Sequence, residues 1–139
     1  MLKTLLSVGA MTLLAVSTAQ ASFLPPNTLH LEDTVLRSNV SEAEFNDAID
    51  KAEEFYKPRI KEAFGGKLKV NRRWDDSTVN ASASQMWGTW SVNMYGGLAR
   101  RPEVTTDGFT LVICHEIGHH VAGFPFSSSW AGDEGQSDY

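Results

Sequence analysis

The segment from Cys114 to His120 contains residue types that carry out metal-dependent hydrolysis, because it reads Cys-His-Glu-Ile-Gly-His-His and includes the pattern H-E-x-x-H. In a helix, His115 and His119 lie one turn apart on the same face and can share a zinc ion. Glu116 would then lie beside a metal-bound water, where it can act as a general base. These three residues predict a zinc-dependent hydrolase.

A catalytic zinc site needs a third protein ligand, and the segment 133–138 offers carboxylates at helical spacing. We expect Glu134 to be the third ligand. Asp138, four residues later, is expected to accept the free N–H of a liganding histidine and thereby fix the histidine tautomer. Asp133 remains an alternative ligand, although its position directly before Glu134, at the start of the expected helix, favours a helix-capping role.

These two motifs together resemble those of the gluzincin metallopeptidases, particularly the branch in which H-E-x-x-H is followed by E-x-x-x-D. The resemblance directly covers residues 86–139. It implies a metalloendopeptidase that cleaves a peptide or protein substrate and binds one Zn²⁺ ion. The two histidines and Glu134 would be the zinc ligands, and Glu116 would be the general base.

Other zinc peptidase patterns fit the chain less well. The metzincin continuation requires a glycine at position 122 and a histidine at position 125, where this chain has Ala122 and Pro125. In gluzincins, the histidine or tyrosine that stabilises the oxyanion usually lies downstream of the second motif. Tyr95 and Tyr139 could each approach the metal in that role, but packing is the simpler interpretation of both.

The same resemblance assigns the substrate cleft to the strand that precedes the zinc helix. In this chain that strand is residues 90–95, and its predicted substrate-binding residues are Trp90, Val92, Asn93 and Tyr95. The edge of this strand could pair with an extended peptide through main-chain hydrogen bonds.

Capping signals and apolar periodicity predict the helices that position the site. A capping box at residues 41–44 begins a helix whose apolar residues recur at helical spacing. We expect Pro58 to kink or interrupt this helix, and Gly65-Gly66 to end it. A second long helix begins at the cap residues 105–107 and carries the histidine pair towards Gly123.

Three strands are predicted between these helices. Residues 67–74 alternate apolar and polar side chains with a period of two, which is typical of a half-buried strand. Residues 78–86 and 89–95 are two further candidate strands, joined by a turn near Trp87-Gly88. The predicted fold is an α+β, zincin-like domain with an N-terminal helix, a small and mostly antiparallel sheet, and then the H-E-x-x-H helix.

The N-terminus predicts export. Residues 1–21 have a basic start at Lys3, an apolar centre and a final A-x-A cleavage signature. We expect cleavage after Ala21, which would leave the domain 22–139 in the periplasm or outside the cell without a stable membrane anchor. The whole chain has a net charge of −5 and contains no long basic cluster, so a nucleic-acid partner is not expected.

Two residues beside the ligands have simpler expected roles. Cys114 is the chain's single cysteine, so it cannot close an internal disulfide in the chain as given; we expect a small buried thiol on the inner face of the zinc helix. A zinc-ligand role is less favoured, because Cys114 points about 100° away from His115 around the helix. His120 is expected to face away from the metal, at the surface or behind a ligand.

The last residues enter a helix that stops at Tyr139, so we expect the domain to be incomplete at its C-terminal end, and a partner for Cys114 beyond residue 139 stays open. Two alternatives to catalysis therefore remain. One is a non-catalytic zinc-binding or interaction domain on the same scaffold. The other is an inactive fragment of a longer peptidase.

Overall fold

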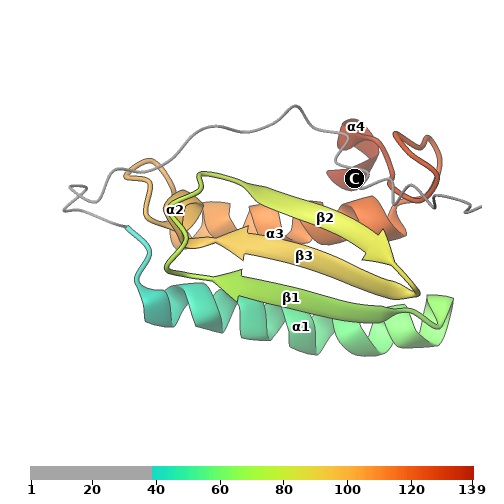
Figure 1. Ribbon diagram of the computed structural model, residues 1–139, viewed down its shortest axis with the longest axis horizontal. Helices are drawn as coiled ribbons and strands as arrows, with labels where there is room; N and C mark the ends of the chain where they lie inside the picture. Colours follow the sequence, from blue (N-terminus) through green and yellow to red (C-terminus); the bar gives the residue numbers. More distant parts are fainter. Residues whose placement is uncertain (1–38) are drawn as a thin grey trace, which may run out of the picture.

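The computed structural model of the protein describes residues 39–139, so the predicted signal peptide and cleavage site lie outside the described residues. The described elements are, in order, α1 (Glu42–Phe64), β1 (Lys67–Arg73), β2 (Ala81–Met86), β3 (Thr89–Tyr95), α2 (Gly96–Ala99), α3 (Thr106–Val121) and α4 (Glu134–Ser137). The two long helices, α1 and α3, contact each other and pack against one small sheet (Figure 1). None of the described helices is both long and apolar enough to cross a membrane.

Helix α1 begins where the capping box predicts. The Ser41 side chain accepts a hydrogen bond from the Glu44 backbone N–H, and the Glu44 carboxylate accepts one from the Ser41 N–H at 2.8 Å. The helix ends at Gly65, whose φ of 66° is a left-handed conformation that favours glycine. Pro58 was expected to kink or interrupt this helix; the interruption is wrong, because α1 is continuous through this residue. Pro58 lies on the exposed side of α1, where water can hydrogen-bond the carbonyl that has lost its N–H partner.

The three strands are ordered β1-β3-β2, with β3 parallel to β1 and antiparallel to β2. Strands β2 and β3 form a hairpin whose turn residues Trp87 and Gly88 have φ values of 51° and 73°. Positive φ at both turn positions matches the twist of two-residue hairpins. The pairing is therefore mixed rather than mostly antiparallel, because β3 returns from the hairpin into the position between β1 and β2. The helices and this small sheet are compatible with the predicted α+β class.

The hydrophobic core lies between the sheet and the two long helices. Phe45 of α1 is completely buried, and its ring centroid lies 5.0 Å from that of Phe109 of α3 and 5.2 Å from that of Trp74. Other fully buried side chains include Ile49, Val92, Met94, Ile113 and Ile117. The histidine-bearing helix is thus held by its apolar face, which leaves its polar residues to form the site.

We expect Phe45→Ala to lower the free energy of unfolding by about 3–5 kcal/mol, because it removes a large buried ring and leaves a cavity. Phe55→Ala is the matched control, since the Phe55 side chain on the same helix is 51% exposed. Urea unfolding of both variants measures the difference. Equal losses for the two variants would contradict this description of the core.

Candidate metal centre

Two histidines and one glutamate converge where α3 meets α4. His115 and His119 lie one turn apart on α3, and Glu134 is the first residue of α4. Their ligand atoms all lie within 4.8 Å of one another. Glu134 Oε2 is 3.0 Å from His115 Nε2 and 3.7 Å from His119 Nε2. The structure therefore brings the three predicted ligands into one cluster that could hold a metal ion.

The other ring nitrogen of each histidine is held by the segment that follows α3. His115 Nδ1 lies 2.7 Å from Asp138 Oδ1, which is the contact predicted for this carboxylate. His119 Nδ1 lies 2.9 Å from the Gly132 carbonyl oxygen and 2.6 Å from Ser137 Oγ, and the Ser137 hydroxyl donates to the Asp133 carbonyl. When the proton of each imidazole is on Nδ1, the Nε2 lone pair is free to bind a metal ion. Both Nε2 atoms lie on the side of Glu134.

Asp133 has the capping role that its position suggested. Its carboxylate accepts a hydrogen bond from the Gln136 backbone N–H at 2.9 Å, and its backbone is extended. Asp133 is not part of the three-residue cluster. The cap orients the first turn of α4, which carries Glu134 towards the histidines.

Gly118 allows α3 and α4 to approach closely, a role that sequence analysis missed. A Cβ atom at this position would overlap the Ser137 carbonyl oxygen and would lie 3.0 Å from the Ser137 carbonyl carbon. Both residues are buried. Ser137 itself could have been noticed, because it lies three residues after Glu134 and therefore near the same face of α4.

Glu116 is buried beside the cluster and is only 5% exposed. The pKa of its carboxyl is raised to about 7, mainly by burial and in addition by the negative charge of Glu134. The charge of His115 and a hydrogen bond with the backbone of Ala83 in β2 act in the opposite direction. A carboxyl group with a pKa near neutrality can both accept and donate a proton, as general acid–base catalysis requires.

The His115 imidazole is affected by several neighbouring groups. Burial lowers its pKa, but the hydrogen bond with Asp138 and the charges of Glu116, Asp138 and Glu134 outweigh burial, so the net shift of the His115 pKa is upward. The same negative charges favour binding of a cation at this position.

His120 is buried, so of the two positions expected for it the surface one is wrong, and its ring stacks on two tryptophans. The His120 ring stacks on Trp90 at 5.3 Å and 9°, and on Trp130 at 4.8 Å and 23°. Burial lowers the pKa of His120 to about 4, so the ring is neutral at pH 7. Sequence analysis missed this arrangement, because the two tryptophans are forty residues apart in the chain.

The predicted role of β3 as an exposed edge strand is wrong, because β3 is central and is hydrogen-bonded on both sides. Its four predicted substrate-binding residues have other contacts. Trp90 stacks on His120, and Val92 is completely buried in the core. Asn93 hydrogen-bonds Ser82 and Asn71 across the sheet, and the Arg73 guanidinium lies over the Tyr95 ring.

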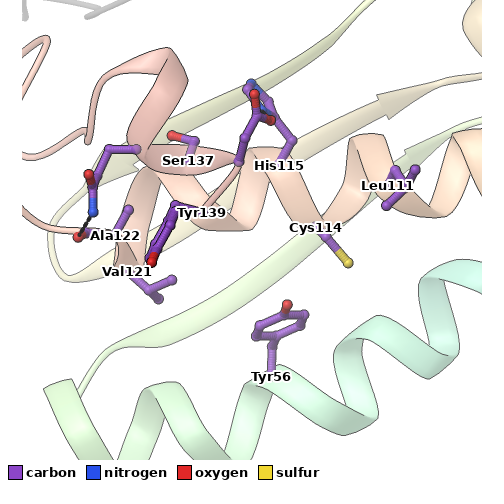
Figure 2. A pocket seen from close by; sticks show the side chains of 11 residues that line it. Tyr56, Leu111, Cys114, His115, Val121, Ala122, Ser137 and Tyr139 are labelled. Carbon is purple, nitrogen blue, oxygen red and sulfur yellow. Dashed lines mark hydrogen bonds and ion pairs between the residues drawn. The ribbon is translucent and has the colours of Figure 1, made fainter.

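A pocket of about 520 Å³ lies between α1 and α3 and extends to the end of the chain. Figure 2 shows Cys114 and Tyr56 facing each other across this pocket, from α3 and α1 respectively. Cys114 is therefore partly exposed in the pocket rather than a buried thiol on the inner face of α3. His115 and Asp138 also line the pocket, so it reaches the back of the ligand cluster.

Comparison of the chain with protein-family models, with curated proteins and with solved structures found no match.

Proposed function

We propose that the protein is a zinc-dependent peptidase of the gluzincin type. The observation that carries this proposal is the cluster of His115, His119 and Glu134, in which the Nδ1 atoms are hydrogen-bonded and the Nε2 atoms lie near one carboxylate. Imidazole nitrogen and carboxylate oxygen are ligands that zinc accepts, and two histidines with one glutamate form a known type of catalytic zinc site.

The composition of the ligand set favours a catalytic over a structural zinc site. Structural zinc sites are usually closed by four protein ligands, most often including cysteine, whereas catalytic sites have three protein ligands and one open position. Cys114 is not part of the described cluster. A buried acid beside the cluster has no purpose in a purely structural site, so Glu116 also favours catalysis over a non-catalytic binding domain.

In the proposed reaction, zinc would polarise the scissile carbonyl and lower the pKa of a bound water. Glu116 accepts the proton of the attacking water and passes it to the leaving amine. The hydrogen bond with the Ala83 backbone holds the Glu116 carboxylate against β2 during this transfer. Asp138 and the Gly132 carbonyl keep the two imidazoles in the orientation that binding requires.

The substrate is proposed to lie along β2 rather than β3. Within the described part of the chain, β2 pairs with β3 on one side only, so its other edge is available for main-chain hydrogen bonds. An extended peptide can add to such an edge as a further strand. Glu116 contacts Ala83 in the middle of this strand, so a peptide bound along this edge would lie next to the proposed base.

Cleavage of casein by the purified full chain tests the proposal. We expect cleavage that stops when the protein is treated with 1,10-phenanthroline and returns when zinc is added. Cleavage that persists after complete removal of metal would contradict the proposal. A folded, zinc-loaded chain that cleaves neither casein nor a library of short peptides would instead support the non-catalytic alternative.

Asp138→Ala is expected to weaken zinc binding about tenfold to a hundredfold, because His115 loses the carboxylate that orients its ring. Asp107→Ala is the control, since it removes an exposed carboxylate from the first turn of α3, away from the cluster. Competition with a chromophoric chelator gives both dissociation constants. An unchanged affinity in Asp138→Ala would refute the orienting role.

A further inference from the structure

The loop between α3 and α4 must return Glu134 to the two histidines, and several of its hydrogen bonds are internal. The Ser127 N–H donates to the Ala131 carbonyl, and the Asp133 N–H donates to the Pro125 carbonyl, both at 2.9 Å. Ser128 Oγ accepts a further bond from the Ala131 N–H at 3.1 Å. These internal hydrogen bonds stabilise the conformation of the loop. They do not fix the position of the loop relative to the sheet.

One aromatic side chain of the loop makes a contact that does fix this position. Trp130 stacks on His120 of α3, and His120 also stacks on Trp90 of β3. The Trp90 ring in turn lies 5.4 Å from that of Phe64 at the end of α1. A continuous row of rings thus connects α1, the sheet, the zinc helix and the ligand-bearing loop.

The His120 ring is held from the sheet as well as by stacking. Its Nε2 lies 3.4 Å from the Ser91 carbonyl oxygen, so the tautomer with a proton on Nε2 can donate a long hydrogen bond to β3. Nδ1 of His120 is buried and has no hydrogen-bond partner among the described residues. The ring is therefore held mainly by stacking on the two tryptophans.

Two members of this row of rings are close to the proposed metal ligands in the sequence. His120 directly follows the ligand His119, and Trp130 precedes Glu134 by four residues. Between them, the Gly132 N–H donates to the His119 carbonyl at 2.9 Å, and the Gly132 carbonyl accepts from His119 Nδ1. A shift of Trp130 away from His120 would move the segment that carries Glu134.

We infer that His120 is a positioning residue for the third metal ligand. Its stacking contacts with Trp90 and Trp130, which together form a clamp, hold the loop in the place from which Glu134 reaches His115 and His119. The role is an extension of the proposed zinc site and rests on it. His120 is not a member of the ligand cluster and acts through the loop.

A double-mutant cycle tests the inference through zinc affinity rather than activity. The zinc dissociation constant is measured for the full chain and for His120→Ala, Glu134→Ala and the double variant. We expect His120→Ala to weaken binding about tenfold to a hundredfold when Glu134 is present, as for other residues that orient ligands. In the Glu134→Ala background, most of this loss should disappear, because the ligand that His120 positions is already gone.

Two further variants separate the clamp from a general effect on folding. His120→Phe keeps both stacking contacts and should restore zinc affinity to within a few-fold of the unmodified chain. Trp130→Ala should reproduce the loss seen for His120→Ala, and it serves in the same cycle if His120→Ala does not fold. Trp87→Ala is the matched control, because Trp87 lies at the tip of the hairpin and is 94% exposed.

Each of the following results would overturn the inference that His120 positions Glu134. Equal losses from His120→Ala with and without Glu134 would overturn the inference while leaving the zinc site intact, as would a His120→Phe variant that binds zinc as weakly as His120→Ala. An unmodified chain that binds no zinc would overturn the proposed function and the inference together.

Discussion

Glu116→Gln is expected to reduce peptide cleavage by about a hundredfold to ten-thousandfold, which is the contribution of a positioned general base. The amide has nearly the shape of the carboxyl group, but it cannot accept the proton of the attacking water. Glu116 is not a member of the ligand cluster, so the variant should bind zinc as well as the unmodified chain. Rates of peptide cleavage and zinc content, measured on the same preparation, check both expectations.

The stability of Glu116→Gln provides an internal check. Burial disfavours the charged form of Glu116, so a neutral amide should not destabilise the fold. Glu54→Gln is the control, because Glu54 is an exposed glutamate on α1. A Glu116→Gln variant that is folded, zinc-loaded and fully active would show that another group removes the proton.

Gly118→Ala is expected to weaken zinc binding at least tenfold without changing any ligand. The new methyl group would overlap the Ser137 carbonyl oxygen, so the backbone of α4 must move away from α3. That movement carries Glu134 and Asp138 away from the histidines, and a misplaced orienting group costs about this much affinity. The same overpacking should lower the free energy of unfolding by about 1–3 kcal/mol.

Gly108→Ala is the matched control for this substitution. Gly108 also lies in α3, but a Cβ atom there would meet only Thr105 Oγ1, at 3.3 Å. Alanine is a better helix former than glycine, so this variant should be neutral or slightly more stable. Titration with zinc and thermal unfolding compare the two variants. Gly118→Ala with the zinc affinity of the unmodified chain would show that α4 does not need its close packing on α3.

Local sequence signals predicted the two long helices, the three strands and the residues of the cluster, but not the short helix α2. The capping box at Ser41 and the glycine at position 65 mark the ends of α1, because each satisfies backbone groups within a few residues. The i, i+4 spacing of the histidines was sufficient to place them on one face of α3. Glu134 and Asp138 could be selected because acidic side chains at helical spacing are visible in the sequence.

Contacts between distant segments could not be predicted in the same way. The period-two pattern of 89–95 identifies a strand, but it does not say whether that strand is central or at an edge. The position of β3 between β1 and β2 follows from tertiary pairing, which is why the free edge was assigned to the wrong strand. The clamp around His120 and the Gly132 carbonyl are likewise products of the folded loop.

The zinc content of the purified full chain, after removal of loosely bound ions, tests the central claim most directly. Glu134→Ala and His119→Ala are the controls. The first removes a ligand whose side chain is 51% exposed and should leave the fold intact, whereas the second removes a fully buried imidazole. We expect about one zinc ion per chain, and loss of tight binding in both controls. A folded chain without zinc, or one whose zinc survives both substitutions, would contradict this expectation.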